Sequence, residues 1–136
     1  MKILRNILAV IGGWIIGSAV NLGIIELGPH IISTPESFDN STMETLAASI
    51  HLLEPANYIS VFLAHGLGTL VGAFAAAKIA ATKKMVFAMV IGCLFLLGGI
   101  MMVFVVPSPT WYTIVDLVGA YIPMAWIGWK LAGGQK

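Results

Sequence analysis

The chain has 136 residues, of which 59% are hydrophobic and only 10% are charged, and its mean hydropathy is +0.97. Soluble domains carry about 25% charged residues, so the composition excludes an ordinary soluble domain and indicates an integral membrane protein. A net charge of +1 with scattered basic residues argues against nucleic-acid binding, and a single cysteine, Cys93, excludes an internal disulfide. No room remains for a separate soluble module, so we expect one transmembrane domain over residues 1–136.

The first apolar segment covers residues 7–28 and contains one charged residue, Glu26, near its end. It is longer than the roughly 7–15 apolar residues of a signal peptide, so we interpret it as a membrane span. The loop that follows, residues 29–56, is too long to be a simple turn. It therefore needs structure of its own.

Ser41 and Glu44 form the S-x-x-E capping-box pattern typical of a helix N-terminus. The apolar residues that follow recur at the spacing of one helical face: Met43, Leu46, Ile50 and Leu53. We predict an amphipathic helix over about residues 42–54, lying flat on the outer surface or capping the bundle.

The second span, residues 57–77, carries small residues at every fourth position. Such a stripe lets the backbone of another helix approach closely. The stripe consists of Ala64, Gly68, Gly72 and Ala76, and it continues just beyond the span at Ala80. The glycines of the first span that could face it are Gly12, Gly13 and Gly17. Packing within one chain and a seam between two copies are both open alternatives.

The third and fourth spans cover residues 85–106 and 111–129, close to the ~20 residues needed to cross hydrocarbon. Tight turns precede them at residues 82–84 and 107–110. Within the fourth span Pro123 has no N–H to donate, so it frees the carbonyl of Gly119 and predicts a kink. The four spans predict an all-α, four-helix membrane bundle.

Charge is sorted between the two sets of span ends, because short cytoplasmic loops retain Lys and Arg. The basic residues at the termini and the second connection are Lys2, Arg5, Lys78, Lys83, Lys84, Lys130 and Lys136. The acidic residues at the opposite ends are Glu26, Glu36, Asp39, Glu44, Glu54 and Asp116. We therefore predict a cytoplasmic (inner) membrane protein with both termini cytoplasmic. Aromatic residues are interpreted as interfacial anchors, with Tyr58, Trp111 and Tyr112 outside and Trp126 and Trp129 inside.

Three polar residues lie at matched depth, roughly 8–12 Å below the predicted outer surface: Asn21, His65 and Asp116. Polar groups in hydrocarbon are costly unless paired, so we expect His65 and Asp116 to meet, with Asn21 nearby and Glu26 higher up. This polar cluster has two interpretations. It either fixes the order of the helices or transfers protons or ions.

A metal site is a further alternative, since all three histidines fall on the predicted outer side. His51 and Glu54 share a helical face, and His30, Glu26 or His65 could complete a set for zinc or another divalent metal. No other cofactor is predicted. Catalysis is weakly supported, because no nucleophile motif or phosphate-binding loop occurs.

The expected role is non-catalytic: an accessory or assembly subunit acting through helix contacts, with the lipid bilayer and other membrane subunits or a second copy as partners. The first alternative is a small ion or solute transporter that uses the polar cluster. The second is a divalent-metal-binding membrane protein. A polar cavity that continued to the inner side beside Lys78 and Lys130 would favour transport over the accessory role.

Overall fold

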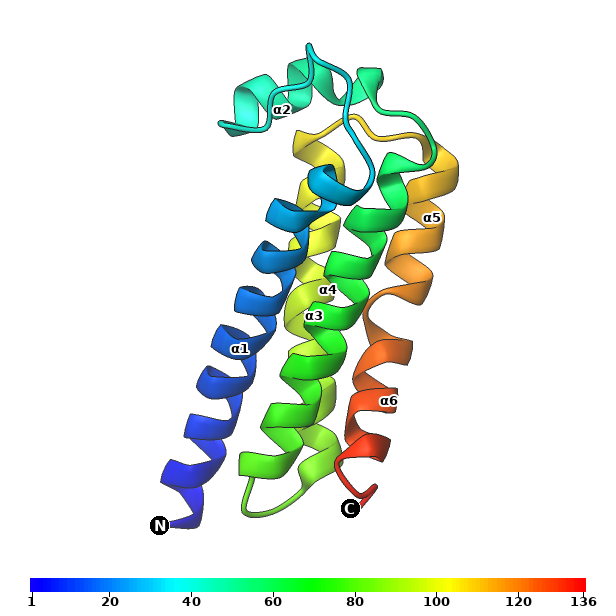
Figure 1. Cartoon of the computed structure of the whole chain (residues 1–136). Coiled ribbons are helices and arrows are strands. Elements are labelled where there is room, and N and C mark those ends of the chain that lie inside the picture. Colours follow the sequence, from blue (N-terminus) through cyan, green and yellow to red (C-terminus); the bar gives the residue numbers. More distant parts are fainter.

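The computed structural model describes residues 1–136 and is built of helices, without strands. The helices are α1 (Lys2–Ile31), α2 (Met43–Ser49), the 3₁₀ helix η1 (Ile50–Leu52), α3 (Asn57–Ile79), α4 (Lys84–Val105), α5 (Thr110–Gly119) and α6 (Ile122–Leu131). Figure 1 shows both termini at one end of the molecule, here called the terminal end, and α2 across the other, the α2 end. The structure confirms two parts of the predicted fold: it is all-helical, and it has four helical stretches long and apolar enough to cross a membrane.

The first helix is longer than the sequence predicts. It begins at Lys2 and passes through Pro29 to end at Ile31. Proline keeps a helical φ and lacks only its own N–H, so a proline within the last turn costs the helix one hydrogen bond without ending it. As a result, the connection between α1 and α3 covers residues 32–56 in place of the predicted 29–56.

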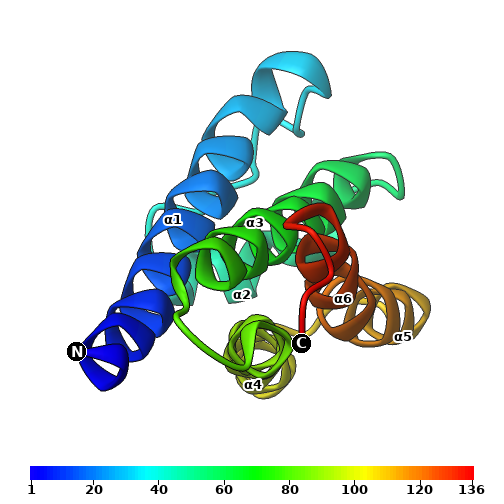
Figure 2. The ribbon, with the colours of Figure 1, turned by 90° about the horizontal axis from the view of Figure 1, so that it is seen from below.

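Helices α1 and α3 approach each other along glycines. A Cβ added at Gly72 would lie 2.6 Å from the carbonyl oxygen of Gly13, and one at Gly68 would lie 2.9 Å from that of Gly17. Real Cβ atoms do not come this close to backbone oxygens, so only glycine fits here. Seen from the terminal end, α4 lies well apart from the last turns of α1 (Figure 2). The two helices therefore diverge toward the α2 end.

The terminal end is closed by small side chains and by the N-terminus. The buried cluster that joins α3, α4 and α6 consists of Ala73, Ala76, Ala77, Ala88, Ile91, Ala125 and Trp129. The Asn6 side chain accepts from the backbone N–H groups of Ala81 and Thr82, at 2.8 and 3.3 Å, and so ties α1 to the α3–α4 turn. Few polar atoms remain without a partner in this half.

The amphipathic segment differs from the prediction in its cap and its length. The capping residues are Thr42 and Thr45, whose hydroxyls each accept the other's backbone N–H at 3.1 Å, in place of Ser41 and Glu44. Ser41 instead turns to the Asp39 carboxylate, whose pKa is lowered by hydrogen bonding from the Ser41 side chain and from the Ser41 backbone N–H, which donates at 2.8 Å. The α-helix then covers only Met43–Ser49, and a 3₁₀ turn completes the segment.

Three of the expected interfacial anchors are buried instead. Tyr58 exposes 3% and Tyr112 6% of its surface, and their rings pack together with centroids 4.5 Å apart. Trp129 is also buried, and its indole N–H donates to the carbonyl of Gln135 at 2.8 Å. Trp111 and Trp126 remain exposed. Tyr58 and Tyr112 are buried because the face of α5 that carries Tyr112 packs against α3.

The fourth stretch breaks where Pro123 predicts a kink. Helix α5 ends at Gly119, and α6 begins at Ile122 with Pro123 in its first turn. The two residues between them, Ala120 and Tyr121, are both buried, and Tyr121 has 2% exposure. The break therefore places a large polar-tipped side chain inside the molecule.

Candidate functional site

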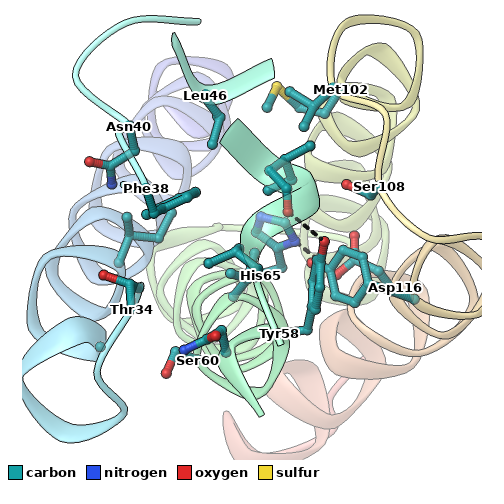
Figure 3. A pocket seen from close by; sticks show the side chains of 18 of the residues that line it. Thr34, Phe38, Asn40, Leu46, Tyr58, Ser60, His65, Met102, Ser108 and Asp116 are labelled. Atoms are coloured by element: carbon teal, nitrogen blue, oxygen red, sulfur yellow. Dashed lines mark hydrogen bonds and ion pairs between the residues drawn. The ribbon is translucent and has the colours of Figure 1, made fainter. Parts of the chain in front are cut away.

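A cavity of about 440 Å³ lies at the α2 end, between α1, α3, α4 and α5. Its roof includes the apolar face of α2, η1 and the residue after them: Met43, Leu46, Ile50 and Leu53. Its side walls include Leu22 and Ile25 from α1 and Met102, Val103 and Val106 from α4. Figure 3 looks into this cavity, with Thr34, Phe38 and Asn40 on one side and His65, Tyr58 and Asp116 grouped on another. Ligand-binding cavities commonly measure about 300–1,000 Å³ and are mostly apolar, as here.

His65, Asp116 and Tyr121 form a hydrogen-bonded network at the base of the cavity. The Nδ1 atom of His65 lies 2.8 Å from Oδ1 of Asp116, and the Tyr121 hydroxyl donates to Oδ2 of Asp116 at 2.8 Å. A carboxylate can only accept, so it selects the His65 tautomer that carries its proton on Nδ1. The Tyr121 hydroxyl also lies 3.1 Å from Nδ1. Each group thereby holds the others in place.

The backbone explains how Tyr121 reaches Asp116. In an unbroken helix, side chains five residues apart would point roughly 140° away from each other. The break at Ala120 and Tyr121 removes that restriction, and Tyr121 turns back onto the Asp116 side chain. On α3, the Thr69 hydroxyl donates to the His65 carbonyl at 2.7 Å, one turn further along. The network is thus held by α3, α5 and the α5–α6 break.

Two polar atoms at the cavity have no partner within the protein. With Nδ1 engaged, the Nε2 atom of His65 makes no hydrogen bond, and it stays accessible on a residue that lines the cavity. The Tyr112 hydroxyl is enclosed and also has no hydrogen-bond partner, although Tyr112 lines the same cavity. Of these two atoms only the Tyr112 hydroxyl is buried, and a buried polar group without a partner is rare and costly.

The predicted polar cluster is assembled in part. The expected contact between His65 and Asp116 is present. Asn21 does not join it: its Oδ1 is enclosed without a partner, and its Cβ lies against Gly68 in the α1–α3 contact. Glu26 is exposed and lines the cavity from α1. Matched depth placed Asn21 correctly along the bundle, but depth says nothing about which side of α1 it occupies.

Sequence reasoning missed Tyr121 and assigned Tyr112 to the membrane interface. A signal for Tyr121 existed, because it precedes Pro123 by two residues and so falls within the predicted kink. Tyr112 lies one turn before Asp116 on the same face of α5. That spacing, combined with a buried Asp116, was the available signal for Tyr112.

The expected metal set does not assemble. No group of three or more His, Cys, Asp or Glu side chains is placed to hold a metal ion. His30, His51 and Glu54 are all exposed. The reason is that the helical segment ends at Leu52, before Glu54, so His51 and Glu54 no longer share a helical face.

No protein-family model, curated protein or solved structure matches this chain. Function therefore has to be argued from the site, not from the fold.

Proposed function

We propose that this chain is a multi-pass protein of the cytoplasmic membrane with both termini on the cytoplasmic side. Large apolar side chains are exposed along α1, α4 and α5, and water would not tolerate so extensive an apolar surface. The basic residues gather at the terminal end, near the N-terminus, the α3–α4 turn and the C-terminus. The positive-inside rule then orients the terminal end toward the cytoplasm and the α2 end outward.

Within the membrane, the chain acts without catalysis, as an accessory protein that binds an amphipathic molecule at its α2 end. The cavity carries this proposal: its walls are apolar, and its lining includes His65, whose Nε2 atom is accessible and has no hydrogen-bond partner in the protein. Apolar walls with a few placed polar groups are the usual composition of a small-molecule site. The hydrogen bonds to Asp116 fix the direction of the His65 ring, so the site is largely pre-formed.

Transport is the second candidate, and the helix break beside Asp116 favours it, since broken helices near ionisable residues occur in transporter sites. A transport path would have to continue to the terminal end near Lys78 and Lys130. The residues that line the cavity reach no further along α3 than His65. Below it lie the small buried side chains of the terminal end. Binding therefore ranks above transport.

The binding role is tested with a cavity-filling substitution and a neighbouring control. Met102 lines the cavity, whereas Met101 faces outward with 68% of its surface exposed. Each protein would be purified from native membrane in mild detergent, and the co-purifying small molecules extracted and quantified by mass spectrometry. We expect one species near equimolar ratio with wild type and Met101→Trp, and its loss from Met102→Trp. No stoichiometric species with wild type, or equal retention by both variants, would refute the binding role.

A further inference from the structure

We infer that the cavity takes a cationic amphiphile, an apolar chain with a protonated amine, whose N–H donates to His65 Nε2 and whose charge is attracted by Glu26. The inference rests on the proposed binding role and names its ligand class. Three properties of the cavity lead to it: the free atom of His65, the charge of the lining and the level of Glu26 in the bundle.

The free atom of His65 selects a hydrogen-bond donor. Figure 3 shows His65 among the side chains that line the cavity. Because the Asp116 carboxylate can only accept, it holds the ring proton on Nδ1, and Nε2 of the neutral ring is left as an acceptor. Ionised carboxylates and phosphates, esters and ketones carry no proton for this atom. The polar end of the ligand is therefore a donor: an amine, an amide or a hydroxyl.

The charge around the cavity favours a cation among these donors. The acidic residues of the lining are Glu26 and Asp116, and no Lys or Arg is among the lining residues. Both oxygens of Asp116 are engaged by other side chains, whereas Glu26 is exposed and makes no ion pair. Residues 6–77 and 85–129 contain no Lys or Arg, so the basic residues are confined to the terminal end. A protonated amine therefore meets opposite charge here, and an uncharged donor gains nothing from it.

Contacts between α1 and α3 show that Glu26 lies close to the level of His65. Two glycine contacts between these antiparallel helices mark the levels: Gly28 against Ser60 and Gly68 against Asn21. Glu26 and His65 both fall between these contacts, and at about 1.5 Å of rise per residue they lie within about 5 Å of each other along the bundle axis. Both line the same cavity of about 440 Å³. An amine at His65 Nε2 is therefore attracted by the Glu26 charge without having to touch the carboxylate.

The walls of the cavity require an apolar chain on the amine. Leu22 precedes Glu26 by one helical turn, so the two share a face of α1, and both line the cavity and are exposed. Val103 of α4 also lines the cavity, with 42% of its surface exposed. Leu22 and Val103 thus belong both to the cavity and to the apolar surface assigned to the bilayer. A chain attached to the amine can pass Leu22 into the lipid, whereas a short, water-soluble amine would leave the apolar walls uncovered.

The test compares four probes that share a twelve-carbon chain and differ in charge and in donor capacity. Dodecylamine is a cation with N–H donors, dodecyltrimethylammonium is a cation without a donor, 1-dodecanol is an uncharged donor, and dodecanoate is an anion. Radiolabelled probe would be equilibrated with the full-length protein in phosphatidylcholine nanodiscs, and empty nanodiscs would give the partitioning background. We expect saturable, near-equimolar binding of dodecylamine, roughly tenfold tighter than that of the other probes, on the scale of one charge-assisted hydrogen bond.

A matched pair of variants assigns the attraction to Glu26. Glu26→Gln removes the charge of a lining residue, and Glu44→Gln removes that of an exposed acid on α2 that does not line the cavity. Glu26→Gln should weaken dodecylamine binding about fivefold, on the scale of one partly exposed ion pair, and leave dodecanol binding unchanged. Glu44→Gln should change neither. Both side chains are exposed, so thermal unfolding of the two variants in one detergent should match that of wild type.

The outcomes separate the ligand class from the binding role. Tighter binding of dodecanol or dodecanoate than of dodecylamine overturns the cationic amine and leaves the binding role standing, and so does a co-purified species without an amine. Dodecylamine binding that is undiminished in Glu26→Gln, or weakened equally in Glu44→Gln, overturns the part assigned to Glu26. Equal affinity for dodecyltrimethylammonium overturns the hydrogen bond to His65. If no probe binds above background and nothing co-purifies with wild type, the ligand class and the binding role both fail.

Discussion

Asp116 organises the polar residues of the α2 end because its two oxygens accept from two different elements. One oxygen faces His65 of α3, and the other faces Tyr121 in the α5–α6 break. Asp116 is buried, so neither partner has water as an easy substitute. Its removal therefore affects both the histidine and the tyrosine.

Asp116→Leu should destabilise the protein because it leaves His65 Nδ1 and the Tyr121 hydroxyl without their acceptor. Each unpaired group costs about 1–3 kcal/mol by soluble-protein measures, and interhelical hydrogen bonds in membranes average nearer 0.6 kcal/mol. Asp116→Asn keeps one carbonyl oxygen and should lose much less. Thermal unfolding in detergent, followed by helical circular dichroism, measures both. Equal loss in the two variants would mean that packing volume, and not hydrogen bonding, is what Asp116 provides.

At the residue scale, the sequence predicts how deep each polar residue lies in the bundle, and therefore which residues lie at the same level. His65 and Asp116 were expected to meet because both lie at the same distance from their span ends, and they do. Depth does not determine rotation about the helix axis, so Asn21 is at the expected height but faces Gly68. Tyr121 escaped prediction for another reason: its direction depends on the local backbone of the break, which a regular helical wheel cannot represent.

At the element scale, the contact between α1 and α3 depends on backbone meeting backbone. Gly68 and Gly72 of α3 lie against the carbonyl oxygens of Gly17 and Gly13 of α1. The every-fourth-residue spacing on α3 predicts such a contact surface, and the spacing of Gly13 and Gly17 matches it. The cap of α2 was less predictable, because Ser41 and Thr42 are both good capping residues, and Ser41 is engaged by the Asp39 carboxylate while Asp39 itself is bonded to Ser49.

Gly68→Leu and Gly72→Leu should each force α1 and α3 apart, with a loss on the order of 1–3 kcal/mol or failure to accumulate in the membrane. Matched controls exist within the chain, because a Cβ at Gly23 or Gly98 would meet nothing within 4 Å. Gly23→Leu and Gly98→Leu add the same side chain and gain the same helix propensity. All four variants would be compared by thermal unfolding in one detergent. If the controls lost as much stability as Gly68→Leu and Gly72→Leu, the close contact would not be what holds α1.

At the scale of the whole molecule, the two ends are built differently. The terminal end is closed by alanines, with α1 tied to the α3–α4 turn through Asn6. At the α2 end, residues of α1 and α4 line a cavity that a short amphipathic segment covers. Because the helices are packed together at the terminal end, their positions at the α2 end are also fixed. The cavity therefore does not depend on a bound molecule to keep its walls apart. The sequence indicates this asymmetry through its small-residue stripes, but the cavity itself follows from the angle between α1 and α4.

The proposed orientation makes a prediction about which end water-soluble reagents reach from outside the cell. Cys93 is exposed and would react on its own, so single cysteines are introduced into a Cys93→Ala background. Ser41→Cys lies in the loop before α2, and Lys83→Cys lies in the α3–α4 turn at the opposite end. Both positions are exposed on their surfaces. A membrane-impermeant maleimide should label Ser41→Cys on intact spheroplasts and Lys83→Cys only after permeabilisation, because Lys and Arg hold the terminal end inside. Labelling of the Lys83→Cys position alone would reverse the orientation, and labelling of both on intact spheroplasts would exclude a four-span arrangement.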